Sequence, residues 1–184
     1  MIEKTIQQRR SVFPAQYNGE TIQKEEIEKI LEAANWAPTH KKTEPWRFKV
    51  FHGDSQRELG DFLARKYTET VSNFSEFKRN KIREKPAQSA CVIAVCMQRD
   101  PAECVPEWEE VAAVAMAVQN MWLLAHEMGI GAYWSSPSLI QYLNEWIPME
   151  EGERCLGFFY MGKYNGVLPQ GVRKTTIGDK TTWV

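Results

Sequence analysis

Residues 107–134 read EWEEVAAVAMAVQNMWLLAHEMGIGAYW. We expect one long helix that begins after Pro106 and ends at Met128, because the glycines that follow supply a stop signal. Apolar residues surround most of this helix, so it should be buried on most sides. Its uncharged part, Val111 to His126, is shorter than the roughly 20 apolar residues that cross a bilayer. The segment is therefore predicted to be a buried helix and not a membrane span.

This helix contains four alanines that are small enough to let another helix approach closely: Ala112, Ala113, Ala115 and Ala117. The approaching helix could be the same helix of a partner subunit. Simple packing within the core would explain the alanines equally well.

Helix and strand patterns are interspersed along the rest of the chain. The expected order is a short helix at 2–8, an amphipathic helix within 24–38, a strand at 46–51, one or two exposed helices within 55–85, a buried central strand at 90–97 and, after the long helix, a strand within 132–137, a short helix at 139–146 and a buried strand at 155–162. The tail from Lys163 has no core of its own and must lie on something. The glycines of GIGAYW precede a strand instead of a helix, which disfavours a Rossmann nucleotide-binding core.

Length and charge exclude several classes of protein. The 184 residues fit a single domain over 1–184. With 23 basic and 24 acidic residues, the chain has no overall field that would favour nucleic acid or an anionic membrane, so we expect neither as a partner. The N-terminal sequence lacks the apolar stretch of a signal peptide, and a cytoplasmic location is expected.

Metal and hydrolytic sites are not supported by residue spacing. The four cysteines lack CxxC or Cys/His ligand spacing and are interpreted as core thiols: Cys91, Cys96, Cys104 and Cys155. The three histidines lie far apart: His40, His52 and His126. Ser135 and Ser136 do not lie in a GxSxG nucleophile elbow. We therefore expect neither a metal ion nor a Ser, His, Asp hydrolase.

Two arginines and a serine stand together where the first helix should end: Arg9, Arg10 and Ser11. The planar fork of arginine suits bidentate phosphate binding, and the hydroxyl adds a neutral donor. Cations at a helix C-terminus are also favoured by the helix dipole and usually face water. The motif alone leaves both interpretations open.

Residues 36–46 read WAPTHKKTEPW and place aromatic, hydroxyl, imidazole and ammonium groups in a loop stiffened by two prolines. Loops held by rigid elements commonly carry binding residues. A solvated connector would explain the lysines but says less about Trp36 and Trp46, which are more often core residues.

Four motifs, taken in order, resemble the nitroreductase family, in particular its small bacterial members. They are RRS, then APTHKKTEPWRF, then GIGAYWSSP, then CLGFFYMGK, and together they span essentially the whole chain. The resemblance implies an α+β fold with a central, mostly antiparallel sheet flanked by helices. It also implies an intertwined homodimer with FMN at the dimer interface.

The resemblance also assigns roles to the motifs. Arg9, Arg10 and Ser11 would hold the flavin phosphate and ribityl chain. The loop would reach the flavin of the other subunit with four residues: Trp36, Thr39, His40 and Lys41. The isoalloxazine ring of the flavin would lie beside Trp134, Ser135 and Ser136. A C-terminal cation, Arg173 or Lys174, would also bind the phosphate.

The sequence departs from the family pattern at two positions. Many relatives have Lys or Arg two residues after the serine of the RRS-like motif, near the flavin pyrimidine edge, and this chain has Phe13. His40 or Lys41 could supply the positive charge that stabilises reduced flavin. Glu44 stands where many relatives have Gln before Pro-Trp, so the local hydrogen-bond pattern is expected to differ from theirs.

The function that the resemblance implies is an FMN-dependent, NAD(P)H-using oxidoreductase. Hydride would pass through flavin N5 by a ping-pong mechanism to a nitroaromatic, quinone or similar flat acceptor, and no side chain is assigned as catalytic. The alternatives are a non-catalytic flavin carrier or sensor on the same scaffold, and a family reductase acting on an enoate or a halogenated aromatic.

Overall fold

The structure is a computed structural model that describes residues 2–184. The helices are α1 (Ile2–Gln8), α2 (Lys24–Asn35), α3 (Ser55–Thr70), α4 (Glu76–Ala87) and α5 (Glu107–Glu127). The strands are β1 (Trp46–His52), β2 (Cys91–Gln98), β3 (Ile130–Ser135) and β4 (Glu153–Lys163). Short 3-10 helices are η1 (Pro14–Gln16), η2 (His40–Lys42), η3 (Ser138–Glu145) and η4 (Gly178–Lys180).

The four strands form one sheet in the order β1-β2-β4-β3, and every neighbouring pair is antiparallel. The expected α+β fold with an antiparallel sheet is confirmed. The apolar run ACVIAVCM forms β2, which pairs on both edges and is therefore a central strand, as predicted. β3 is an edge strand, so one side of its backbone is free to meet other groups.

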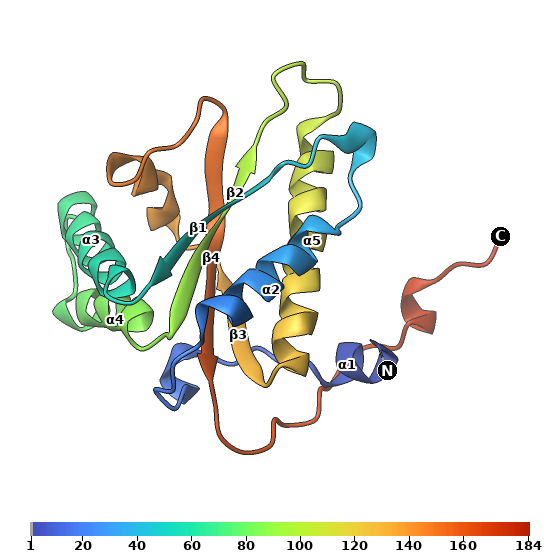
Figure 1. The fold of residues 1–184 in the computed structure, drawn as a ribbon, viewed down its shortest axis with the longest axis horizontal. Coiled ribbons are helices and arrows are strands. Elements are labelled where there is room, and N and C mark those ends of the chain that lie inside the picture. Colours follow the sequence, from blue (N-terminus) through green and yellow to red (C-terminus); the bar gives the residue numbers. More distant parts are fainter. Residues whose placement is uncertain (1) are drawn as a thin grey trace.

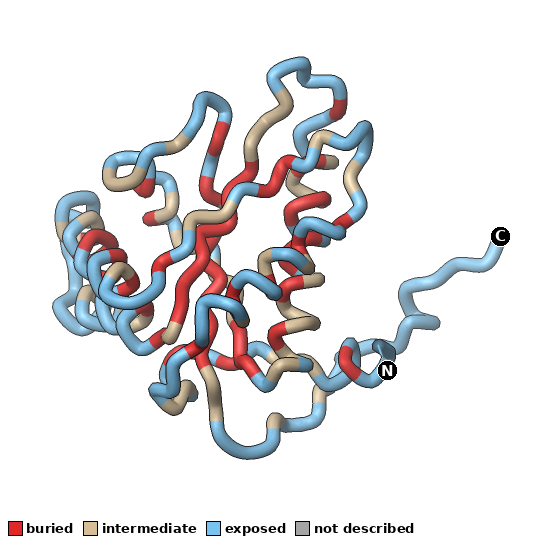
Figure 2. The backbone as a smooth tube through the Cα atoms, in the orientation of Figure 1, coloured by how far each residue is buried: buried red, intermediate tan, exposed pale blue. Residues whose placement is uncertain are grey.

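The two faces of the sheet are covered by different helices (Figure 1). Alternate residues of a strand point to opposite faces, and β2 follows this rule. Ile93 and Val95 pack in a cluster with residues of α2 and α5, whereas Val92 and Ala94 pack with residues of α3 and η3. Because both faces are covered, β2 is apolar from Cys91 to Met97 and is buried along nearly all of its length (Figure 2).

Helix α5 packs mainly on the sheet and on α2, and its outer face stays exposed. Ala113 and Ala117 face the core, whereas Trp108 is 69% exposed and Met116 is 40% exposed. The expectation of burial on most sides is therefore wrong for a single chain. The reason is that α5 lies at the surface of the folded chain, and no other segment of residues 2–184 covers its outer face (Figures 1 and 2).

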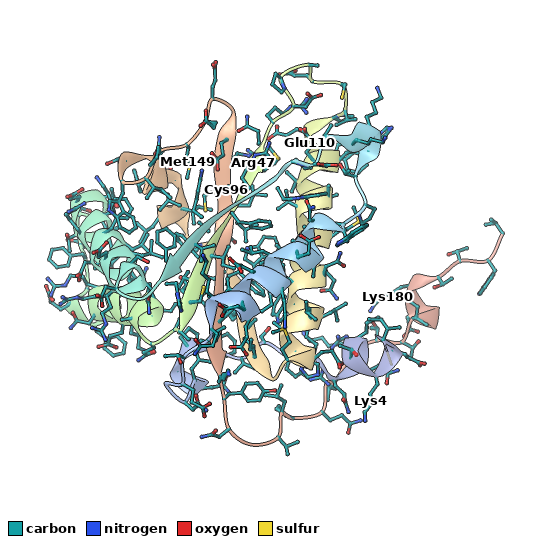
Figure 3. The ribbon with its side chains drawn as sticks, viewed as in Figure 1. Lys4, Arg47, Cys96, Glu110, Met149 and Lys180 are labelled. Carbon is teal, nitrogen blue, oxygen red and sulfur yellow. The ribbon has the colours of Figure 1, made fainter. Side chains whose placement is uncertain are left out.

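The short helix expected at 139–146 is confirmed as the 3-10 helix η3, which Pro137 and Pro148 bound. Two other local expectations need correction. Cys104 is exposed, so only the other three cysteines are core thiols. The tail lies against α1 only as far as Arg173, whereas residues 174–184 are exposed and extend away from the body, with Lys180 among them (Figure 3).

Within residues 2–184, no helix is long and apolar enough to cross a membrane.

Candidate functional site

The RRS motif lies where α1 ends and the chain meets the edge of the sheet. The Arg9 amide donates to Thr5 O at 2.9 Å, which closes the last turn of α1. Ser11 then forms an isolated parallel bridge with Ala132, and the Val12 amide donates to Ala132 O at 3.0 Å. The motif is thereby fixed beside the first half of β3, while the second half of that strand edge stays open.

Arg9 lies over α5, with its Cζ atom 4.5 Å from the centre of the Trp122 ring. Burial lowers the pKa of Arg9, and the neighbouring charges of Arg10 and Arg173 lower this pKa further. The Nε atom of Arg9 and the Nε1 atom of Trp122 are both shielded from solvent, and neither has an acceptor within residues 2–184. Two adjacent buried donors without acceptors are costly unless a ligand accepts from them.

Arg10 connects this motif to the C-terminal segment. Its Nε atom donates to Pro169 O at 3.0 Å, and its Nη1 atom donates to Gln7 O at 2.7 Å. A Cβ atom on Gly171 would lie 2.3 Å from Arg10 Nη2, so a larger residue there would displace the guanidinium group. The segment after β4 is therefore held against the end of α1.

A cavity of about 800 Å³ opens here between α1, the end of α5 and residues 164–173. Arg10, His126 and Arg173 line it, and Lys174 is exposed outside the lining. Burial lowers the pKa of His126, and Arg9 and Arg10 lower it further against the opposing charge of Glu127. None of Arg9, Arg10 and Arg173 forms an ion pair within residues 2–184. The cluster is thus a concentration of positive charge without a counter-ion of its own.

The three residues Trp134, Ser135 and Ser136 continue along the same edge of the sheet. Trp134 is half-buried, and its Nε1 atom is a further shielded donor without an acceptor in residues 2–184. A Cβ atom on Gly157 of β4 would lie 2.6 Å from that Nε1 atom, so the glycine determines how deeply Trp134 sits. The Ser135 hydroxyl accepts a hydrogen bond from Lys85 Nζ at 3.3 Å, and Ser136 is exposed.

Lys85 of α4 is a candidate that the sequence did not single out. Its Nζ atom lies 4.5 Å from the centre of the Tyr133 ring and 4.7 Å from that of Tyr160. The ring of Phe13 packs on Tyr133 with its centroid 4.6 Å away. Burial lowers the pKa of Lys85, partly offset by Tyr133. The sequence gives no signal for this role, because α4 is rich in lysine and only the tertiary fold buries this one.

The loop of residues 36–46 lies at the other end of α5 from the RRS motif (Figure 1). His40 Nδ1 lies 2.5 Å from Glu109 Oε2, and Lys41 Nζ donates to Cys104 O at 2.9 Å. These contacts anchor the loop to the start of α5, whereas the RRS motif contacts its last turns. Within one chain, His40 and Lys41 therefore do not approach the arginine cluster.

The backbone of this loop is strained and its first aromatic side chain is exposed. Lys41, Lys42 and Glu44 all have positive φ angles, of 51°, 56° and 42°, which non-glycine residues rarely adopt. Thr39 Oγ1 contacts Thr43 Oγ1 at 3.0 Å and accepts from the Glu44 amide at 3.3 Å, which holds the turn. Trp36 is 78% exposed and donates through Nε1 to Glu32.

Among residues 2–184, no group of three or more His, Cys, Asp or Glu side chains is arranged to hold a metal ion. His52 Nε2 instead lies 3.0 Å from Ile22 O.

Comparisons with known proteins find relatives that match over most of this chain. The Escherichia coli K12 protein YdjA, named provisionally as an NAD(P)H nitroreductase, is 28% identical over 87% of this chain and 86% of its own length. The Bacillus subtilis protein YfhC, named in the same way, is 26% identical over 99% of this chain and 93% of its own.

Solved structures show the same fold. A nitroreductase-like protein from Bacillus cereus has a TM-score of 0.84 at 29% identity, covering 100% of this chain and 96% of its own. A Desulfovibrio desulfuricans protein solved with FMN, and named provisionally as a nitroreductase, has a TM-score of 0.75 at 23% identity, covering 100% and 96%. The model of the Nitroreductase family matches residues 6–163. The chain therefore belongs to the nitroreductase family.

Proposed function

We propose that this protein is an FMN-dependent oxidoreductase that takes electrons from NAD(P)H and reduces a flat, electron-poor organic acceptor such as a nitroaromatic or a quinone. The observation that carries the proposal is the arginine cluster beside an open strand edge. The cations of Arg9, Arg10 and Arg173 gather without a carboxylate, directly beside a strand whose far half offers a surface for a planar ring. Membership of the nitroreductase family and the names of the relatives support it.

The arginine end suits the phosphate of FMN. Phosphate accepts bidentate hydrogen bonds from guanidinium groups, and the shielded Nε donor of Arg9 needs such an acceptor. Ser11 adds a hydroxyl at the strand edge. Arg173 is the C-terminal cation that we assign to the phosphate, because its charge acts on Arg9 and it lines the cavity.

The ring end suits a flavin that rests on Trp134, Ser135 and Ser136. When bound, FMN supplies the ring that carries the hydride. Lys85 is the cation of this chain that lies next to the ring segment, through its hydrogen bond to Ser135. We assign to Lys85 the positive charge that relatives place at the position of Phe13, and this charge would stabilise the anionic edge of a reduced ring.

The remaining residues require a second copy of the chain. α5 has 21 residues and is roughly 30 Å long, so its two ends cannot meet at one site in one chain. Antiparallel pairing of two α5 helices through their exposed faces would place the Trp36 to Lys41 loop of one protomer beside the arginine cluster of its partner. Trp108, Ala115 and Met116 provide the exposed face.

The first experiment asks whether the protein binds FMN and whether NAD(P)H reduces it. The purified protein should quench free FMN fluorescence, and anaerobic addition of NADH or NADPH should bleach the visible absorbance of the bound flavin. Adding a nitroaromatic or a quinone should then restore the absorbance. A protein that binds no FMN would refute the proposal, and bleaching without reoxidation would refute the acceptor class.

A complementation experiment tests the two-sided site. An Arg9→Ala chain and a His40→Ala chain each form homodimers in which both sites are defective. A mixed dimer would contain one site with both substitutions and one intact site. Mixing the two chains should therefore restore tight FMN binding and turnover in part. If the mixture stays as inactive as the two homodimers, each site is built within one chain and the dimer proposal fails.

A further inference from the structure

A second cavity, of about 540 Å³, lies on the opposite face of the sheet from α5. It is enclosed by α3, α4 and η3, with Leu63, Ile82 and Leu139 among its apolar walls and the rings of Tyr67 and Tyr160 beside them. Its size falls in the ordinary range for small-molecule sites. The mixture of apolar walls and tyrosine rings suits a planar organic ligand.

The charges around this cavity all have one sign. Lys78 and Lys85 line it, and no aspartate or glutamate of residues 2–184 does. Neither lysine forms an ion pair in that part of the chain. Lys78 is exposed, whereas Lys85 is partly buried against the Tyr133 and Tyr160 rings. A buried ammonium without a counter-charge is costly, and an anion in the cavity would relieve that cost.

The cavity adjoins the segment that we assign to the flavin ring. Pro137 and Ser138, which directly follow Ser136, line its wall. Lys85 joins the two places, since it lines the cavity and donates to Ser135. An ammonium has three N–H donors, so Lys85 can hold Ser135 and still face a ligand in the cavity.

From this arrangement we infer that the cavity binds a planar organic anion, such as an aromatic carboxylate or phenolate, with Lys85 at its inner end and Lys78 at its mouth. This inference rests on the proposed function to the extent that the anion is the acceptor, or part of the acceptor, that reoxidises the flavin. Lys78 and Lys85 are then specificity residues that favour an anionic acceptor over a neutral one of the same shape.

The test uses benzoate and benzamide as probes, because they share shape and differ in charge, and neither can be reduced by a flavin. Titration calorimetry on the FMN-loaded protein should show benzoate binding at least about tenfold more tightly than benzamide. The preference should shrink as salt is added, because salt screens the lysine charges. Equal affinities for the two probes, or binding of benzoate only when FMN is absent, would overturn the inference.

Three variants locate the effect. Lys78→Gln should weaken benzoate binding about threefold, as expected for an exposed charge, and Lys85→Gln about tenfold. Benzamide affinity should stay the same in both, which also shows that the cavity is still folded. Lys81→Gln is the matched control, since Lys81 lies on the same helix, is exposed and packs on Phe77 outside the cavity. A benzoate preference that survives the Lys78→Gln, Lys85→Gln pair would refute the inference.

The same measurements separate this inference from the proposed function. If the protein binds benzoate more tightly than benzamide but NAD(P)H does not reduce its flavin, the anion site is supported and the oxidoreductase proposal is refuted. If NAD(P)H reduces the flavin and the protein turns over, but benzoate and benzamide bind equally, the oxidoreductase proposal is supported and the anion site is refuted. Where both hold, 4-nitrobenzoate should have a KM about tenfold below that of 4-nitrobenzamide, with similar kcat.

Discussion

The two ends of α5 illustrate two different ways of preparing a binding site. At the last turns of α5, cations gather without counter-charges, and the buried donors of Arg9 and Trp122 lack acceptors. At the first turns, His40 and Lys41 in the loop of residues 36–46 already have partners, which are Glu109 and Cys104 O. The first end is preorganised for an anionic ligand, whereas the second is held in shape by its own chain and offers an exposed Trp36.

This difference has an energetic meaning. Gathering three guanidinium groups costs free energy that only a bound anion returns, so the arginine end trades stability for affinity. In the loop of residues 36–46, three residues have positive φ angles. This strained backbone is held by contacts within the chain and not by a ligand. Four substitutions test whether the two ends depend on each other.

The largest effect should come from breaking the proposed dimer. Breaking it would separate the first turns of α5 in one protomer from the last turns of α5 in its partner. Met116→Arg places a charge on the exposed face of α5, where the proposed dimer buries it, and should convert the dimer to a monomer. FMN affinity should fall about 100-fold or more with it. Light scattering and FMN fluorescence titration measure the two quantities. Val50→Arg is the matched control, because Val50 is 41% exposed but lies on β1. A monomer that still binds FMN tightly would show that the arginine end suffices alone.

The second effect concerns the arginine end directly. Arg9→Ala removes the half-buried guanidinium and should weaken FMN binding about 10- to 100-fold. Because it also relieves repulsion from Arg10 and Arg173, the FMN-free protein should lose little stability. Lys174→Ala, outside the cavity, should change the affinity less than about threefold. Equal effects of the two substitutions would mean that charge alone, and not the built cluster, attracts the ligand.

The third effect concerns the sheet edge between the two ends. Gly157→Ala would bring a Cβ atom to 2.6 Å from Trp134 Nε1 and 2.7 Å from Ser135 O, so β3 must shift. We expect the free energy of unfolding to drop by about 1–3 kcal/mol and FMN affinity to fall with it. Urea denaturation measures the first quantity. Gly178→Ala, whose nearest contact would be an ordinary 3.5 Å, serves as the control and should be close to neutral.

The smallest effect is a pH dependence at the arginine end. Burial and then the charges of Arg9 and Arg10 lower the pKa of His126 below 6.5, so the unfolded chain takes up a proton before the folded one as the pH falls. The stability of the FMN-free protein should therefore decrease as the pH drops below about 6.5, towards the lowered pKa of the folded state.

The matching variant is His126→Asn, which should flatten this part of the stability curve measured by urea denaturation between about pH 5 and pH 7. If the variant and the wild type have parallel curves in that range, His126 is not held neutral by the cluster.

Most of the fold could be read from periodicity. The alternation in WRFKVF, the apolar run ACVIAVCM and the long pattern after Pro106 each gave the right kind of element within about two residues. These patterns succeed because burial on one or two faces of an element imposes a repeat on the chain. The site was accessible in another way, since RRS, APTHKK and YWSS were found by resemblance and not by any repeat.

What the sequence by itself determined is the element order, the central position of β2 and the RRS, APTHKK and YWSS motifs, because side-chain chemistry and spacing are local properties. The tertiary structure decided which of those residues can meet. It placed Arg173 with Arg9, separated His40 and Lys41 from them by most of the length of α5, and left one face of that helix exposed. It also buried Lys85 beside Ser135, which no pattern in a lysine-rich helix could reveal, because burial depends on what the rest of the chain packs around it.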